Sequence, residues 1–167
     1  EKCSQQIQSG DSIFLDGSPP CWFVARRLAN KNLTVLTTSL QIATILAASP
    51  TISLILIGGA FSPKSMAFLG DNACRALSNY YVDKAFISCR SVSMENGLTD
   101  VSEGEAAIHR LITQRSNRTY LVVDHSKLNN VSFSRIAPVT SVDGIIMDQE
   151  FPPEWTDYLT AHQIKMF

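Results

Sequence analysis

Short apolar runs rich in β-branched residues alternate with amphipathic segments along the whole chain. Runs of this length predict β-strands, and apolar residues at helical spacing predict helices between them. This alternation is typical of an α/β fold with a mostly parallel, twisted sheet and helices on both faces. The predicted strands are Ser12–Leu15, Leu33–Leu36, Ile52–Ile57, Val82–Ser88, Arg118–Val123 and Gly144–Met147, with shorter ones at Phe133–Ile136 and Ile164–Phe167.

The run Ile52–Ile57 is nearly all apolar, which predicts a central strand covered on both faces. Ser102 and Glu105 have the spacing of a capping box, which marks a helix start. We expect Ala60–Gly70 and Arg90–Val101 to be loops. The predicted helices are Cys21–Asn30, one capped by Ser39 and ending at Ala48, one capped by Asp71 and ending near Tyr80, one from Ser102 to about Arg115, and Glu154–Ala161.

The chain has 167 residues, 45% of them hydrophobic and 17% charged, which is enough for one well-packed domain. We therefore expect a single domain over 1–167, with a small C-terminal lobe from about 126–167. The net charge of −1 gives no global electrostatic reason to bind nucleic acid or a membrane. Four scattered cysteines form no zinc motif or disulfide framework and suit the cytoplasm, so we expect no metal and no cofactor.

Small, polar or charged residues directly follow five of the predicted strands. In open parallel sheets, ligands bind beyond the carboxyl ends of the strands, so these residues are the candidates for a site. Each cluster can also be read as an ordinary turn, because the same residue types favour turns and helix caps. The clusters are Asp16-Gly17-Ser18, Thr37-Thr38-Ser39, Gly58-Gly59, Ser88-Cys89-Arg90 and Asp124-His125-Ser126-Lys127.

The chemistry of these clusters favours a small anionic ligand. Small residues let backbone N–H groups approach an anion, while hydroxyl groups and cations complete its shell, which is how proteins commonly hold phosphate. The glycine-rich motifs of dinucleotide and nucleoside-triphosphate sites are absent from the sequence. We therefore expect a small phosphorylated ligand.

The same residues resemble a known family. Their order along nearly the whole chain is similar to the C-terminal effector-sensing domain of the DeoR family of bacterial transcriptional regulators. The segments that carry the resemblance are Ile13–Ser18, Leu33–Ser39, Leu56–Gly59, Pro63–Ser65, Phe68–Gly70, Val82–Ile87, Gly97–Thr99, Glu105–Ala107 and Val123–Lys127.

The resemblance implies a fold similar to ribose-5-phosphate isomerase and the acetyl-CoA transferases, and a phosphorylated sugar as effector. It also implies a homo-oligomer, a dimer or tetramer, and a repressor that binds operator DNA through an N-terminal winged helix-turn-helix absent from this chain. The start at Glu1 without Met agrees with a fragment of a longer protein. The predicted effector-binding residues are Asp16, Gly17, Ser18, Thr37, Thr38, Ser39, Gly58, Gly59, Lys64, Arg90, Glu105, Asp124 and Lys127.

Two loops depart from the family's pattern. Where the family has Asp-Ser-Gly-Thr-Thr, residues 16–20 read Asp-Gly-Ser-Pro-Pro, and the two prolines remove backbone donors. After the fourth strand, Arg90 stands where the family has a sugar-hydroxyl acceptor. We expect its guanidinium to lie near a desolvated crevice and to compensate for the lost donors by binding phosphate bidentately.

Several candidates also have a purely structural interpretation. Asp16 and Glu105 can each serve as a helix cap, Lys64 as a solvated loop residue, and Asp83-Lys84 as an ion pair away from the site. His109 lies in a predicted helix without a metal-spaced partner. Two other functions stay open: a sugar-phosphate isomerase, because the resembling fold hosts such enzymes, and an oligomerisation module with a vestigial pocket.

Overall fold

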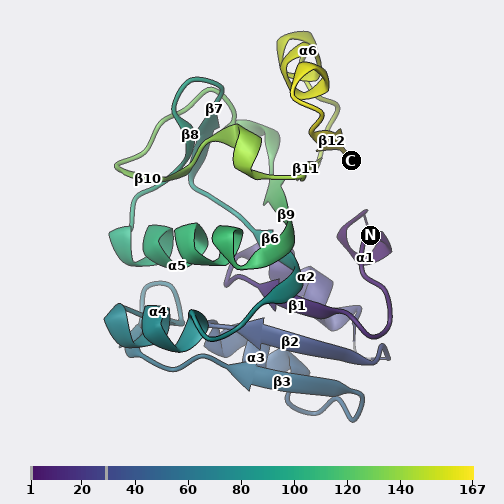
Figure 1. Cartoon of the computed structure of the whole chain (residues 1–167), viewed down its shortest axis with the longest axis vertical. Helices are drawn as coiled ribbons and strands as arrows, with labels where there is room; N and C mark the ends of the chain where they lie inside the picture. Colours follow the sequence, from purple (N-terminus) through teal and green to yellow (C-terminus); the bar gives the residue numbers. More distant parts are fainter. Residues whose placement is uncertain (1, 29) are drawn as a thin grey trace.

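Seven parallel strands form the central sheet of the computed structural model, which describes residues 2–28 and 30–167. Their order is β12-β11-β9-β6-β1-β2-β3 (Figure 1). The predicted α/β fold with a mostly parallel sheet is therefore confirmed. The strands are β1 (Ser12–Leu15), β2 (Leu33–Thr37), β3 (Ile52–Leu56), β6 (Val82–Ile87), β9 (Ser116–Val123), β11 (Gly144–Met147) and β12 (Lys165–Met166).

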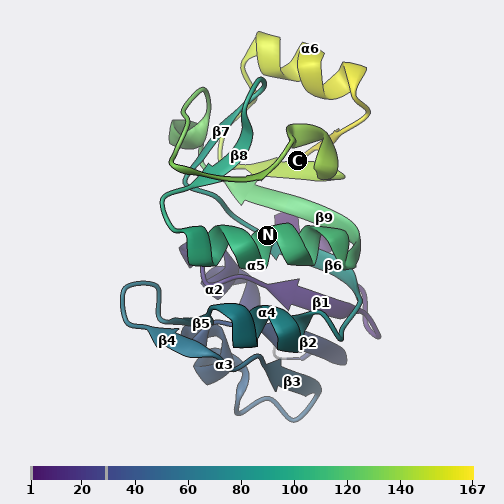
Figure 2. The same cartoon turned by 60° about the vertical axis from the view of Figure 1, so that its left-hand side comes forward.

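Helices cover both faces of this sheet (Figures 1 and 2). They are α1 (Lys2–Gln5), α2 (Pro19–Arg26), α3 (Leu40–Leu46), α4 (Asp71–Leu77), α5 (Glu103–Gln114) and α6 (Pro153–Ala161). In β1, Ile13 and Leu15 join the hydrophobic core beneath α1, α2 and α3, whereas Phe14 joins the core beneath α4 and α5. The alternation of side chains along a strand thus produces two cores, one on each face.

The helix starts agree only in part with the predicted caps. The Ser39 hydroxyl accepts a hydrogen bond from the Ile42 N–H at 3.3 Å, which confirms that cap. Ser102 does the same for the Glu105 N–H at 3.3 Å. The prediction for Asp71 is wrong: Gly70, with a φ of 88°, occupies the N-cap and Asp71 is the first helical residue. A glycine can adopt this left-handed conformation without steric cost.

The helix predicted at Cys21–Asn30 begins two residues earlier, at Pro19, and ends at Arg26. Proline is well accepted in the first turn of a helix, where its missing N–H has no intrahelical partner. The predicted range includes Ala29, which, like Glu1, lies outside the described residues.

Both predicted long loops contain short antiparallel strands, so those loop predictions are wrong. Strands of three or four residues carry too little periodicity to stand out from a polar loop. The first loop forms a hairpin of β4 (Ala60–Ser62) and β5 (Ala67–Leu69). The second forms a small sheet of β7 (Ser91–Ser93), β8 (Gly97–Asp100) and β10 (Ser134–Ala137).

The segment predicted as a central strand is instead the edge strand β3. Its side chains do reach both cores, because Ile55 packs against one and Ile52 and Leu54 against the other. These three side chains are only half-buried and Leu56 is exposed, so the strand is covered in part, and its apolar sequence does not show that a neighbouring strand lies on each side. Among the described residues, no helix is long and apolar enough to cross a membrane.

Gly97 of β8 allows this strand to approach β10 closely, and we predict that Gly97→Ala destabilises the protein by roughly 2–4 kcal/mol. Its φ is 74°, and an added Cβ would lie 2.1 Å from the carbonyl oxygen of Ala137. The expected loss in the free energy of unfolding has two sources: an alanine in a left-handed backbone conformation is strained, and its Cβ would overlap the neighbouring chain. Urea unfolding measures it.

Gly58→Ala is the matched control, because a Cβ added at Gly58 would have no neighbouring atom within 4 Å. We expect this control to change the free energy of unfolding by less than about 0.5 kcal/mol. Equal losses in the two variants would contradict the role assigned to Gly97.

Candidate functional site

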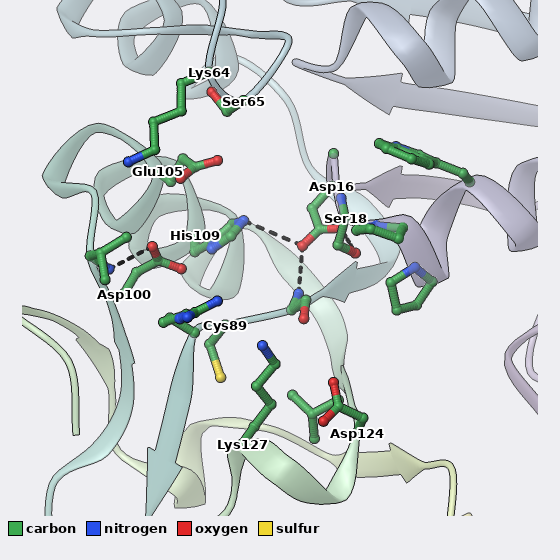
Figure 3. A pocket seen from close by; sticks show the side chains of 18 of the residues that line it. Asp16, Ser18, Lys64, Ser65, Cys89, Asp100, Glu105, His109, Asp124 and Lys127 are labelled. Atoms are coloured by element: carbon green, nitrogen blue, oxygen red, sulfur yellow. Dashed lines mark hydrogen bonds and ion pairs between the residues drawn. The ribbon is translucent and has the colours of Figure 1, made fainter. Parts of the chain in front are cut away.

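A cavity of about 850 Å³ lies at the carboxyl ends of β1, β6 and β9. The start of α2, the hairpin turn between β4 and β5, the end of β8 and one face of α5 complete its wall (Figure 3). Its volume is typical of a small-molecule site. The predicted residues that line it are Asp16, Gly17, Ser18, Lys64, Arg90, Glu105, Asp124 and Lys127.

The predicted residues Thr37, Thr38 and Ser39 lie outside this lining and connect elements of the framework. The Thr37 hydroxyl donates to the carbonyl oxygen of Leu15 at 2.7 Å and accepts from the Ser39 N–H at 3.0 Å. The carbonyl of Thr38 accepts a hydrogen bond from the Phe68 N–H at 2.8 Å. These buried groups join β2 to β1 and to the β5 hairpin behind the cavity.

Gly58 and Gly59 also lie outside the cavity lining. A Cβ at Gly59 would lie 2.7 Å from the carbonyl oxygen of Leu69 and 2.9 Å from the Cβ of Ala73. Gly59 therefore lets the chain after β3 pass close to the hairpin and α4. This close packing is a structural reason for a glycine at that position.

Asp16 is the most highly connected polar residue of the cavity. Only 3% of it is exposed. One carboxylate oxygen accepts from both the N–H and the hydroxyl of Ser18, and the other accepts from the Ser88 N–H at 2.5 Å. The second oxygen also lies 3.5 Å from Nε2 of His109 (Figure 3). Asp16 thus connects the ends of β1 and β6 with α5.

The start of α2 offers few donors to an anion. The N–H of Ser18 already donates to Asp16 at 2.9 Å, and the next two residues, Pro19 and Pro20, have no N–H. The expectation that this loop lacks phosphate donors therefore agrees with the geometry.

Five further polar residues that line the cavity were not among the predicted site residues: Ser65, Ser88, Cys89, Asp100 and His109. His109 stands four residues after Glu105 on α5, a spacing that places both on one helix face and that provided a signal. Asp100 accepts hydrogen bonds from the N–H groups of Val101 at 2.7 Å and Ser102 at 3.2 Å. It escaped prediction because β8 itself was not foreseen.

Burial and carboxylates shift the titration of two cavity residues. Burial first, and then the Asp100 and Asp16 carboxylates, raise the pKa of the Cys89 thiol to about 12, so this thiol is neutral near pH 7. Burial first, and then Asp100, also raise the pKa of Glu105 above its usual value. Figure 3 shows the Lys64 side chain reaching toward Glu105.

Arg90 lies at the edge of the cavity, as expected, but the residue itself is exposed. The strand β6 ends at Ile87, so Arg90 lies beyond the buried part of the sheet. The expected ion pair away from the site is present: Lys84 pairs with Asp11, and Asp83 accepts hydrogen bonds from Ser12.

Three buried side-chain nitrogen or oxygen atoms of the described residues have no hydrogen-bond partner, and all three belong to residues that line the cavity. They are Nε1 of Trp22, Oγ of Ser65 and Nδ1 of His109. Buried polar groups are nearly always paired, so these atoms indicate a place where a ligand would supply donors and acceptors. No group of three or more His, Cys, Asp or Glu residues in the described part of the chain could hold a metal ion.

The chain is similar to curated regulators along most of its length. It is 35% identical over 99% of the chain to the uncharacterized HTH-type transcriptional regulator YulB of Bacillus subtilis, and 32% identical over 96% to the regulator IolR of the same species. It spans 64% of the length of each of them. It is also 29% identical over 96% of the chain to the B. subtilis transcriptional repressor GlcR, of which it spans 62%.

Solved structures with this fold include ribose 5-phosphate isomerases and eIF2B subunits. Ribose 5-phosphate isomerase A of Methanocaldococcus jannaschii superposes with a TM-score of 0.54 at 18% identity, over 76% of this chain and 50% of its own. The delta subunit of eIF2B from Chaetomium thermophilum gives a TM-score of 0.61 at 16% identity, over 90% of this chain and 54% of its own. At these identities the likeness concerns the fold alone.

The family comparison is more specific than the structural one. The family model described as the DeoR C terminal sensor domain matches residues 1–149. The matched family is a sensor domain, and the relatives named above are transcriptional regulators rather than enzymes. The chain therefore belongs to the DeoR family and contains its C-terminal sensor domain.

Proposed function

We propose that this domain senses a phosphorylated sugar in the cavity described above, and that the bound sugar controls DNA binding by a winged helix-turn-helix elsewhere in the same protein. The observation that carries the proposal is the composition of the cavity wall. It combines three cations, four carboxylates and three buried polar atoms without partners. Cations suit a phosphate, and carboxylates accept hydrogen bonds from sugar hydroxyl groups.

The relatives support the regulatory part of this proposal. They carry the HTH designation, and GlcR is named a repressor, so we propose a cytoplasmic repressor whose affinity for operator DNA changes when the sugar binds. Such control requires that the sugar bind one arrangement of the protein more tightly than the other.

We predict that phosphorylated sugars bind and that their unphosphorylated parents bind at least about 10-fold more weakly, because charge-assisted contacts to the phosphate are lost. Calorimetric titration with ribose 5-phosphate, glucose 6-phosphate and fructose 6-phosphate against the free sugars measures this. Equal affinities for both forms would refute the proposal. Product analysis of the same mixtures would separate a sensor from an isomerase, because a sensor leaves the sugar phosphate unchanged.

The raised pKa of Glu105 predicts that Glu105→Gln stabilises the domain near pH 7. A carboxyl with a raised pKa in the folded state holds its proton more tightly there, so stability falls as pH rises above the usual value of 4.5. Glutamine does not ionise, so the variant does not lose stability in this way as the pH rises. Urea unfolding at about pH 4 and about pH 7.5 measures the difference, which should be present at the higher pH and shrink at the lower one.

Glu103, two residues earlier on α5, provides the control with the opposite sign. Hydrogen bonds from Ser134 and Arg110 lower the pKa of its carboxyl, so Glu103→Gln should destabilise the domain near pH 7. If Glu105→Gln destabilised the domain at neutral pH, the burial assigned to Glu105 would be wrong.

We also predict that the domain self-associates through exposed apolar side chains next to β8 and β10. Phe133 is 89% exposed and Val101 is 54% exposed, and they adjoin the paired residues Ser134 and Asp100. Phe133→Asp should therefore weaken the oligomer. Sedimentation at tens of micromolar, roughly where micromolar affinities are visible, measures it.

Tyr81→Ser is the control for this prediction, because Tyr81 is 64% exposed but precedes β6 rather than adjoining β10. It should leave the sedimentation profile unchanged. A monomeric parent protein would count against self-association, and an equal effect of both variants would count against this surface.

A further inference from the structure

We propose that the phosphate of the sugar binds in a second, smaller hollow beside the cavity, between Arg90 and Lys127. This inference rests on the proposed function and assigns the two ends of the ligand to different compartments. The hollow has a volume of about 350 Å³. It is lined by Arg90, Ser91, Ser126, Lys127, Asn130 and Val131.

The first argument is the separation of charge between the two compartments. Arg90 and Lys127 line both of them, so they stand at the junction. The described lining of the hollow holds these two cations and no carboxylate. The carboxylates all belong to the large cavity: Asp16, Asp100, Glu105 and Asp124. A phosphate dianion is attracted to the first environment and repelled by the second.

The second argument is that the other places around the cavity where an anion could bind attract it less strongly. Lys64 points toward Glu105 (Figure 3), so this cation faces a carboxyl group that would repel a phosphate. The start of α2 offers few donors, because the Ser18 N–H serves Asp16 and two prolines follow. The pair Arg90 and Lys127 is therefore the strongest anion position that the described residues provide.

The third argument is that the wall of the hollow is held in place before any ligand arrives. The side-chain amide of Asn130 donates to the carbonyl oxygens of Ser126 at 3.1 Å and Leu128 at 3.0 Å. The N–H of Ser126 donates to Asp124 at 3.0 Å. These bonds fix the backbone of the turn that carries Lys127, so the backbone loses little conformational entropy when an anion binds.

The two compartments also define the class of ligand. A phosphate at one end of a sugar can lie between Arg90 and Lys127 while the hydroxyl groups extend into the cavity among the carboxylates. A second phosphate would have to enter that carboxylate-rich region. The geometry thus favours a terminal monophosphate over a bisphosphate.

The test is calorimetric titration of the variants Lys127→Met and Arg90→Ala with ribose 5-phosphate, glucose 6-phosphate and inorganic phosphate. We expect each variant to bind these probes about 10- to 100-fold more weakly, the range for lost hydrogen bonds to charged groups. Arg90→Lys should recover part of the loss, because an ammonium group keeps the charge but not the planar fork. Fructose 1,6-bisphosphate should bind the parent protein more weakly than fructose 6-phosphate.

Two comparison variants make the result specific. Lys165→Met removes an exposed cation on β12, outside both compartments, and should leave binding unchanged. Lys64→Met should cause a smaller loss than Lys127→Met. Circular dichroism checks that each variant is folded.

The outcomes separate the two proposals. If sugar phosphates bind the parent protein but Lys127→Met and Arg90→Ala bind them equally well, or if Lys64→Met causes the largest loss, the hollow is not the phosphate subsite and the sensor function stands. If no probe binds the parent protein saturably at up to about 10 mM, a free energy near −3 kcal/mol, both proposals fail.

Discussion

The buried carboxylate of Asp16 determines the arrangement of the site. A charge that is 97% removed from solvent is unfavourable unless it is paired and hydrogen-bonded. Ser18, Ser88 and His109 satisfy it from the β1–α2 loop, the end of β6 and the middle of α5. These three elements are far apart in the sequence, and the need to satisfy one carboxylate holds them together at the floor of the cavity.

The parallel sheet supplies the floor of the cavity, and the short antiparallel elements supply its walls. The β4–β5 hairpin carries Lys64 over the opening, and the β7–β8 hairpin places Arg90 and Asp100 at its side. The hollow between Arg90 and Lys127 has no carboxylate in its lining, whereas the cavity wall carries four, so the surface around the ligand is divided into regions of different charge. This division is consistent with a ligand that has one anionic end and one neutral, hydroxyl-rich end.

The sequence allowed the main sheet and much of the cavity to be predicted, because strand periodicity locates the residues that follow each strand. That argument found Asp16 and Lys127. It also placed Thr37 at the site. However, β2 lies farther from the cavity than β1, and the Thr37 hydroxyl donates a hydrogen bond to the backbone of β1 instead. It missed His109, because helix periodicity alone does not show which buried polar residue faces a cavity. It also missed Asp100, because the short strand β8 gave no signal.

The most direct test of the account is a titration of operator DNA with the complete regulator that contains this domain, followed by fluorescence anisotropy. The account predicts that a sugar phosphate that binds the domain changes the affinity for operator DNA by at least about fivefold, the lower end of typical allosteric coupling. The free parent sugar should have no effect at the same concentration. Identical DNA affinities with and without a sugar phosphate that saturates the domain would contradict it.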